Sequence, residues 1–164
     1  MFSKEQKKII EEFGLIELPE EGGFYKNTYQ SKLMIDFSNV KKSIAGAIYY
    51  FITEEHFSAL HKLKCDEMWH FYAGDPIEIL VFNDSHFDIV ELGNKNFELH
   101  KPQTIVPSHY WQGARLKTGG RWALLGTNTF PAYSQSNFEL AKLPTFENFE
   151  SEKLQIIKKY IRIS

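Results

Sequence analysis

The stretch that decides the fold runs from residue 58 to residue 74 and reads SALHKLKCDEMWHFYAG. Apolar and aromatic residues lie on both sides of its short charged middle at residues 64–66, and along a strand the side chains alternate between two faces with a period of two. We therefore predict two strands joined by a turn. His61 shares a face with Leu63 on the first strand, and Glu67 shares a face with Trp69 on the second. Both polar side chains are expected to point to the apolar side, where a carboxylate is costly unless it is paired or bound to a metal.

The same period, or a short apolar run, recurs through the middle of the chain between turn-forming residues. Strands are predicted at residues 23–29, 44–53, 57–62, 67–73, 77–83, 87–92, 97–99, 104–106, 114–117 and 122–129. Strands spaced by about 8–12 residues are typical of an antiparallel sandwich or small barrel. No helical pattern long enough for a parallel crossover lies between them, which argues against a parallel sheet.

Helical signals lie only at the two ends of the chain. Ser3 and Gln6 have the spacing of a capping box, and Gly14 can end the helix that follows. At about residues 150–162, apolar residues recur at helical spacing among charged ones. We expect two short amphipathic helices that lie on the surface of a larger body.

The composition predicts one globular domain over residues 1–164, with a core at about 15–140. Hydrophobic residues make up 43% of the chain and charged residues 24%, and the aromatic share of 15% favours sheet. The net charge of -2 gives no electrostatic reason to expect nucleic acid or membrane as partners. The single cysteine, Cys65, excludes an internal disulfide and a cysteine-rich metal site.

A cytoplasmic location is expected. The longest apolar run covers residues 44–52, far short of the roughly 20 residues that span a bilayer as a helix. The first eight residues alternate in charge and do not resemble a signal peptide.

Two motifs in order along the chain resemble those of the cupin superfamily. The spacing His61-x5-Glu67-x6-Gly74 is similar to the first cupin motif, Gly-x5-His-x-His-x3-4-Glu-x6-Gly. Residues 107–112, PSHYWQ, are similar to the second, Pro-x-Gly-x-x-His. Together with EGGFY at residues 21–25, they resemble the small single-domain branch classed as a domain of unknown function. The resemblance implies an all-β double-stranded β-helix (the cupin jelly-roll barrel) with short flanking helices, usually a homodimer.

The chain departs from the metal-binding cupins at two positions. Those proteins supply three histidines and one glutamate, but Leu63 occupies the second histidine position and Gln112 the third. One imidazole, one carboxylate and one neutral amide are a poor ligand set for a transition metal. We therefore expect no metal and no cofactor, and predict a charge-assisted hydrogen bond between His61 and Glu67 inside the barrel.

A histidine and a glutamate that face one pocket can move a proton, so His61 and Glu67 are the candidate catalytic residues. The candidate substrate-binding residues are Tyr49, Ser58, Trp69, Trp111 and Gln112.

The metal-free relatives implied by the resemblance are the sugar-nucleotide 3,5-epimerases, which use a barrel histidine as base and a tyrosine as acid. His61 would be the base, and Tyr49, Tyr72 or Tyr133 could supply the acid, since no spacing selects among them. The basic residues that would hold a diphosphate are scattered: Arg115, Lys117 and Arg121.

Three functions remain open from the sequence. The first is binding of a small polar metabolite inside the barrel, with metal-independent isomerase or epimerase chemistry at His61 and Glu67. The second is a non-catalytic ligand-binding or regulatory cupin module. The third is a metal-dependent oxygenase or isomerase, which needs Gln112 and water to complete a metal site. A homodimer is expected in each case, with residues 24–29 as the candidate interface.

Overall fold

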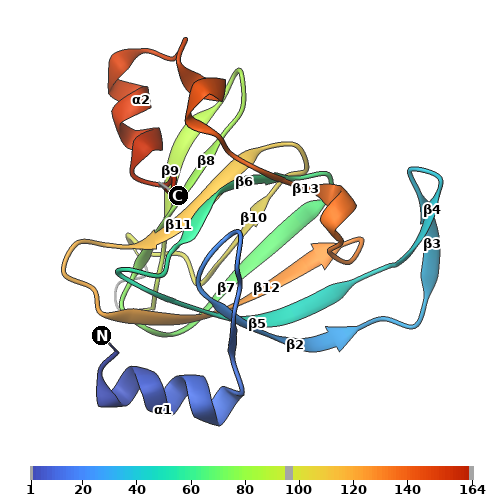
Figure 1. Cartoon of the computed structure of the whole chain (residues 1–164), viewed down its shortest axis with the longest axis horizontal. Helices are drawn as coiled ribbons and strands as arrows, with labels where there is room; N and C mark the ends of the chain where they lie inside the picture. The colour runs from blue at the N-terminus through green and yellow to red at the C-terminus, as the bar shows by residue number, and fades with distance from the viewer. Residues whose placement is uncertain (1, 95–97, 163–164) are drawn as a thin grey trace.

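The computed structural model describes residues 2–94 and 98–162, and its strands form two sheets packed face to face (Figure 1). The six-stranded sheet contains, in spatial order, β1 (Ile16–Glu17), β2 (Phe24–Gln30), β5 (Gly46–Thr53), β12 (Trp122–Phe130), β7 (Asp66–Gly74) and β10 (Gln103–Val106). The five-stranded sheet contains β13 (Phe138–Leu140), β6 (Ser58–Leu63), β11 (Trp111–Leu116), β8 (Ile77–Phe82) and β9 (Phe87–Leu92). The all-β jelly roll is thus confirmed, although the two sheets do not close into one continuous barrel.

The predicted strands correspond to observed ones, with ends shifted by at most three residues, except at 97–99. Residue 97 lies outside the described part of the chain, and Glu98 and Leu99 form a turn, so no strand is present at those two positions.

The sequence reading missed a hairpin that stands away from the two sheets (Figure 1). Its strands are β3 (Met34–Phe37) and β4 (Val40–Ser43). The turn residues Ser38 and Asn39 both have left-handed backbone angles, with φ of 51° and 63°, as the tight hairpin turns of antiparallel strands require.

The main core lies between the two sheets and confirms the predicted alternation. On β7, Glu67, Trp69 and Phe71 are buried, while Met68 and His70 between them are partly exposed. The inward side chains of β7 pack with residues of β5, β8, β11 and β12. The period of two on β7 therefore places a glutamate inside the roll beside its aromatic neighbours.

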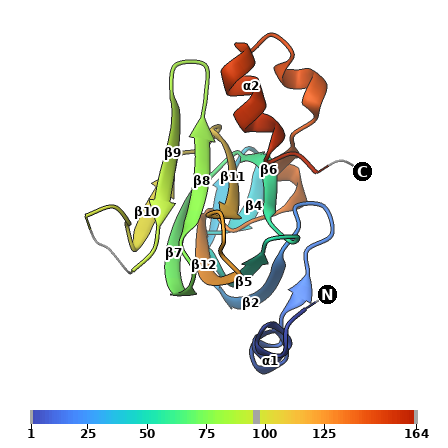
Figure 2. The ribbon, with the colours of Figure 1, turned by 90° about the vertical axis from the view of Figure 1, so that its left-hand side faces the viewer.

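The two helices cover the outer faces of the roll, on opposite sides (Figure 2). Helix α1 (Lys4–Phe13) has the predicted capping box and ends at Gly14. It packs against the outer face of the six-stranded sheet, where Phe51 is fully buried. Helix α2 (Ser151–Lys158) ends earlier than predicted, and packs with the short helix η2 (Leu143–Phe146) on the five-stranded sheet. A further short helix, η1 (Gln135–Asn137), precedes β13. In the described part of the chain, no helix has the length and apolar character to cross a membrane.

Candidate functional site

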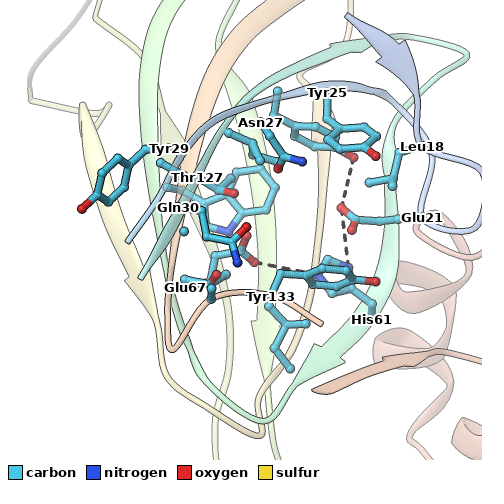
Figure 3. Close-up of a pocket in the computed structure, with 18 residues that line it drawn as sticks. Leu18, Glu21, Tyr25, Asn27, Tyr29, Gln30, His61, Glu67, Thr127 and Tyr133 are labelled. Carbon is cyan, nitrogen blue, oxygen red and sulfur yellow. Dashed lines mark hydrogen bonds and ion pairs between the residues drawn. The ribbon is translucent and has the colours of Figure 1, made fainter. Parts of the chain in front are cut away.

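A cavity of about 330 Å³ opens inside the roll (Figure 3). Its walls come from β2, β5, β6, β7 and β12, and from the loops that precede β2 and follow β12. Its polar and aromatic lining consists of Glu21, Tyr25, Asn27, Tyr29, Gln30, Tyr50, His61, Glu67, Trp69, Thr127, Thr129 and Tyr133. The size is that of a small-molecule site.

His61 lies on β6 with only 1% of its surface exposed. Its Nδ1 lies 2.8 Å from the carbonyl oxygen of Ala59, and because a carbonyl only accepts, Nδ1 must carry a proton. Its Nε2 lies 3.9 Å from Oε2 of Glu67, an ion-pair distance that is too long for the predicted hydrogen bond between the two side chains. The second ring nitrogen is therefore the one that can exchange a proton with a ligand.

Glu67 is held by a chain of hydrogen bonds that begins at Trp69. The indole N–H of Trp69 donates to Oε1 of Gln112 at 2.9 Å, and Nε2 of Gln112 donates to Oε2 of Glu67 at 2.7 Å. The amide orientation of Gln112 is thus fixed from both ends. Among the residues that the structure describes, none donates a hydrogen bond to Oε1 of Glu67.

Glu21 is a candidate site residue that the sequence reading missed. It lies in the loop before β2, and its Oε1 accepts a hydrogen bond from the hydroxyl group of Ser58 at 2.6 Å. The Tyr50 hydroxyl shares its one proton between this oxygen, at 3.1 Å, and the carbonyl oxygen of Gly22, at 2.7 Å. The same oxygen lies 3.9 Å from Nδ1 of His61, on the other side of the ring from Glu67 (Figure 3). The neighbouring Gly23 has a φ of 72°, and a Cβ there would lie 2.8 Å from the Tyr50 hydroxyl. A glycine is therefore needed where this loop passes Tyr50.

The charges of this cluster are strongly coupled. Burial by itself lowers the pKa of His61, but the negative charges of Glu21 and Glu67 outweigh it and raise that pKa to about 9. Burial raises the pKa of Glu21, and the charge of Glu67 raises it further, while His61 opposes both. At neutral pH the expected state of His61 is the imidazolium ion.

The sequence and the fold place this chain in a known family. A family model described as Cupin superfamily (DUF985) matches residues 7–141. The chain belongs to this cupin family.

Among solved structures, this cupin is similar to a hypothetical protein from Leishmania major, with 22% identity and a TM-score of 0.87 over 96% of this chain and 98% of that one. It is similar over the full length of both chains to a protein from Shewanella oneidensis, with 25% identity and a TM-score of 0.86. A dTDP sugar isomerase from Desulfovibrio desulfuricans has 18% identity and a TM-score of 0.52 over 78% of this chain and 80% of that one, which is a likeness of fold. A comparison with curated proteins gives no match.

The residues of this cupin do not fit the metal that many cupins bind. Leu63 lines the cavity at one histidine position and offers no ligand atom. At another histidine position, Oε1 of Gln112 already accepts a hydrogen bond from Trp69, and Nε2 of Gln112 donates one to Glu67. No set of three or more His, Cys, Asp or Glu side chains within residues 2–94 and 98–162 is arranged to hold a metal ion. The remaining donors are one imidazole and two carboxylates that are not arranged to hold a metal ion within the described residues, and we derive no step through a metal.

Of the residues predicted from the sequence, the structure brings His61, Glu67 and Trp69 together on the cavity wall. Ser58 and Gln112 are buried behind that wall, where they hold Glu21 and Glu67.

Two other predicted binding residues lie away from the cavity. Tyr49 points to the outer face of the six-stranded sheet, where it contacts Phe13 of α1 and Tyr72. Trp111 lies on the outer face of the five-stranded sheet, against Phe146 and the ammonium group of Lys62. Adjacent residues on a strand face opposite sides, so Tyr50 and Gln112 take the inward positions.

The tyrosines considered as acids are also separated. Tyr133 lines the cavity, whereas Tyr72 lies outside it with Tyr49. Strand alternation could have identified Tyr50 as a cavity residue, because it shares its face with Ile48 and Ile52. Glu21 lies in a loop, where no alternation in the sequence shows which side chains face the cavity.

Proposed function

We propose that this cupin binds a small polar metabolite in the cavity and transfers a proton on it, as a metal-independent isomerase or epimerase. One observation supports this above the others: Nε2 of His61 faces Oε2 of Glu67 at an ion-pair distance of 3.9 Å, beyond hydrogen-bond length, and both residues line one cavity. Oε1 of Glu67 accepts no hydrogen bond from the described residues. Nε2 of His61 can donate a proton and Oε1 of Glu67 can accept one.

The chemistry that suits this pair is proton abstraction next to a carbonyl group. The imidazolium of His61 donates a hydrogen bond from Nε2 to the carbonyl oxygen of the ligand, while the carboxylate of Glu67 takes the proton from the adjacent carbon. The electrons of the broken C–H bond form a C=C bond, and the oxygen becomes an enol as it takes the proton of Nε2. If the enol turns its other face to Glu67 before the proton returns to the same carbon, the product is the epimer. In a 2-hydroxy carbonyl ligand, return of the proton to the former carbonyl carbon, with transfer of the 2-hydroxyl proton to Nε2 of His61, gives the isomer. The high pKa of His61 makes it the acid of this pair, in place of the base expected from the epimerase resemblance.

Hydrogen exchange tests the proposal without knowledge of the natural ligand. The purified chain is incubated in D₂O with a set of aldoses, ketoses and 2-hydroxy ketones, and deuterium in the carbon-bound positions is followed by NMR. For a responsive compound, we expect His61→Gln and Glu67→Gln to lower the exchange rate by about 100-fold or more, since a positioned acid or base contributes about 10²–10⁴-fold. The exposed residues His86 and Glu147 supply matched controls, His86→Gln and Glu147→Gln, which should exchange at the wild-type rate.

Two outcomes would overturn the proposal. Exchange that persists in both cavity variants would place the reaction elsewhere. Compounds that raise the melting temperature of the wild type but exchange no deuterium would favour the second candidate, a non-catalytic ligand-binding module.

The homodimer stays a prediction. Strand β2 pairs with β1 only at Phe24 and Tyr25, so within the described structure residues 26–30 have no strand partner on that side. This edge supports an interface near the predicted segment 24–29. Light scattering that gives a monomer mass at micromolar concentration would contradict it.

A further inference from the structure

The charges that line the cavity limit which ligands it can accept. Its ionisable wall consists of Glu21, His61 and Glu67 together with tyrosines, and among the described residues of the lining none is lysine or arginine. Within the described lining, two carboxyl groups therefore face one imidazole ring. An anionic ligand such as a phosphate or diphosphate ester would find no basic side chain there and would lie beside two carboxylates.

We propose that the cavity takes a small metabolite that carries an amine, bound as its ammonium ion by the carboxylate of Glu21, and that it discriminates against phosphorylated and carboxylated ligands. The inference rests on the proposed function in one respect, since it assumes that the cavity holds a ligand.

Glu21 is the carboxylate suited to this role. Both of its hydroxyl donors, Ser58 and Tyr50, contact Oε1, so its Oε2 atom accepts no hydrogen bond within the described structure. The two donors also fix the side chain, which lowers the entropy cost of holding a ligand. Glu67 then remains for the proton transfer, on the far side of His61 from Glu21.

The aromatic lining agrees with a cationic ligand. Tyr25, Tyr50, Trp69 and Tyr133 all contribute to the wall. An ammonium ion over the face of an aromatic ring gains about 0.5–2 kcal/mol, the larger value where water is excluded. A neutral alcohol of the same shape gains no such stabilisation.

Matched trios of fragments test the inference. Each trio holds an amine, an alcohol and a carboxylate on one carbon skeleton, for example cyclohexylmethylamine, cyclohexylmethanol and cyclohexanecarboxylate, small enough for a cavity of about 330 Å³. Dissociation constants are measured for the wild-type chain at pH 7 by NMR, with the Trp69 indole signal as the marker of the cavity. We expect each amine to bind at least about tenfold more tightly than its alcohol, and the carboxylate more weakly than both.

Glu21→Gln should abolish the tenfold preference for the amine while it leaves alcohol binding within about twofold. The glutamine can still accept from Ser58 and Tyr50, so the cavity wall should keep its shape. The matched control is Glu20→Gln, because Glu20 is exposed, hydrogen-bonded to Gln135 and outside the lining. It should bind like the wild type.

The inference is overturned if carboxylates or alcohols bind the wild type as tightly as amines, or if no amine shifts the Trp69 signal. These results are separate from those of the hydrogen-exchange test. Amine selectivity without deuterium exchange would refute only the proposed proton transfer. Deuterium exchange on neutral sugars without amine selectivity would refute only the proposal that the ligand carries an amine.

Discussion

The substitution Glu21→Gln tests the electrostatic account of the site directly, because it removes one charge and keeps the shape of the side chain. Oε1 of Glu21 lies 3.9 Å from Nδ1 of His61, and its negative charge is one of the two that raise the pKa of His61 to about 9. Without that charge, the imidazolium ion loses one of its two carboxylate neighbours, and burial then favours the neutral ring.

The size of the effect follows from the distance. Two unit charges at 3.9 Å interact by about 1 kcal/mol in a water-like dielectric and by about 4 kcal/mol at an effective dielectric constant of about 20. These energies correspond to about sixfold and about a thousandfold in the protonation equilibrium of His61. Since the side chain of Glu21 is 14% exposed and that of His61 is 2% exposed, the interaction energy of about 4 kcal/mol at the lower dielectric constant applies more closely. We expect proton affinity to fall by at least about tenfold.

The assay is an NMR titration of the imidazole signals between pH 5 and 10, with the His61 signal assigned from its loss in His61→Gln. Glu20→Gln serves as the control, because Glu20 lies outside the cavity lining and should leave the titration unchanged. A His61 proton affinity in Glu21→Gln equal to or higher than that of the wild type would refute the proposed coupling of the two residues.

Two further predictions concern stability. Gly74 has a φ of 101°, and a Cβ there would lie 2.3 Å from the carbonyl oxygen of Trp122, whereas Gly119 has a φ of 85° and nothing within 4 Å. Gly119→Ala should therefore lower the free energy of unfolding, measured in urea, by about 1 kcal/mol, the cost of backbone strain alone. Gly74→Ala should lower it by about 3 kcal/mol or more, and equal losses for the two variants would contradict the close approach at Gly74. The folded pKa of His61 is raised from 6.5 to about 9, so its stabilisation is complete below about pH 6.5 and is lost as the pH rises through 9. The melting temperature of the wild type should fall relative to His61→Gln over this range, and parallel curves would show that the ring is not stabilised as an ion.

The strands were predictable where burial is one-sided. On β7 the inward face carries Trp69 and Phe71 beside Glu67, and the outward face includes the polar residues Asp66 and His70, so the two faces can be told apart in the sequence. The hairpin of β3 and β4 stands away from the two sheets, and its first strand has no fully buried side chain. Without a buried face the sequence carries no period, and only the turn at Ser38 and Asn39 marks the hairpin.

The site was predictable in part for the same physical reason. The predicted residues Tyr49 and Trp111 are each next to an inward-facing residue of the same strand. Adjacent residues on a strand face opposite sides, so Tyr49 and Trp111 point away from the cavity. His61 and Glu67 could be found because a motif fixes them. Glu21 could not, since a loop has no period and its contacts with Tyr50 and Ser58 join positions 29 and 37 residues apart.

The hydrogen bond between Trp69 and Gln112 has a consequence for how this cupin folds. It spans 43 residues of sequence and joins β7 of one sheet to β11 of the other, so it cannot form until both sheets have met. Contacts between residues so far apart in sequence form late in folding, because the chain must lose much conformational entropy before they are made. The fluorescence of Trp69 should accordingly change in the slowest phase of refolding, after the local hairpins have formed. A newly made chain would acquire its candidate site only after both sheets have met, and no hairpin fragment of it would carry that site.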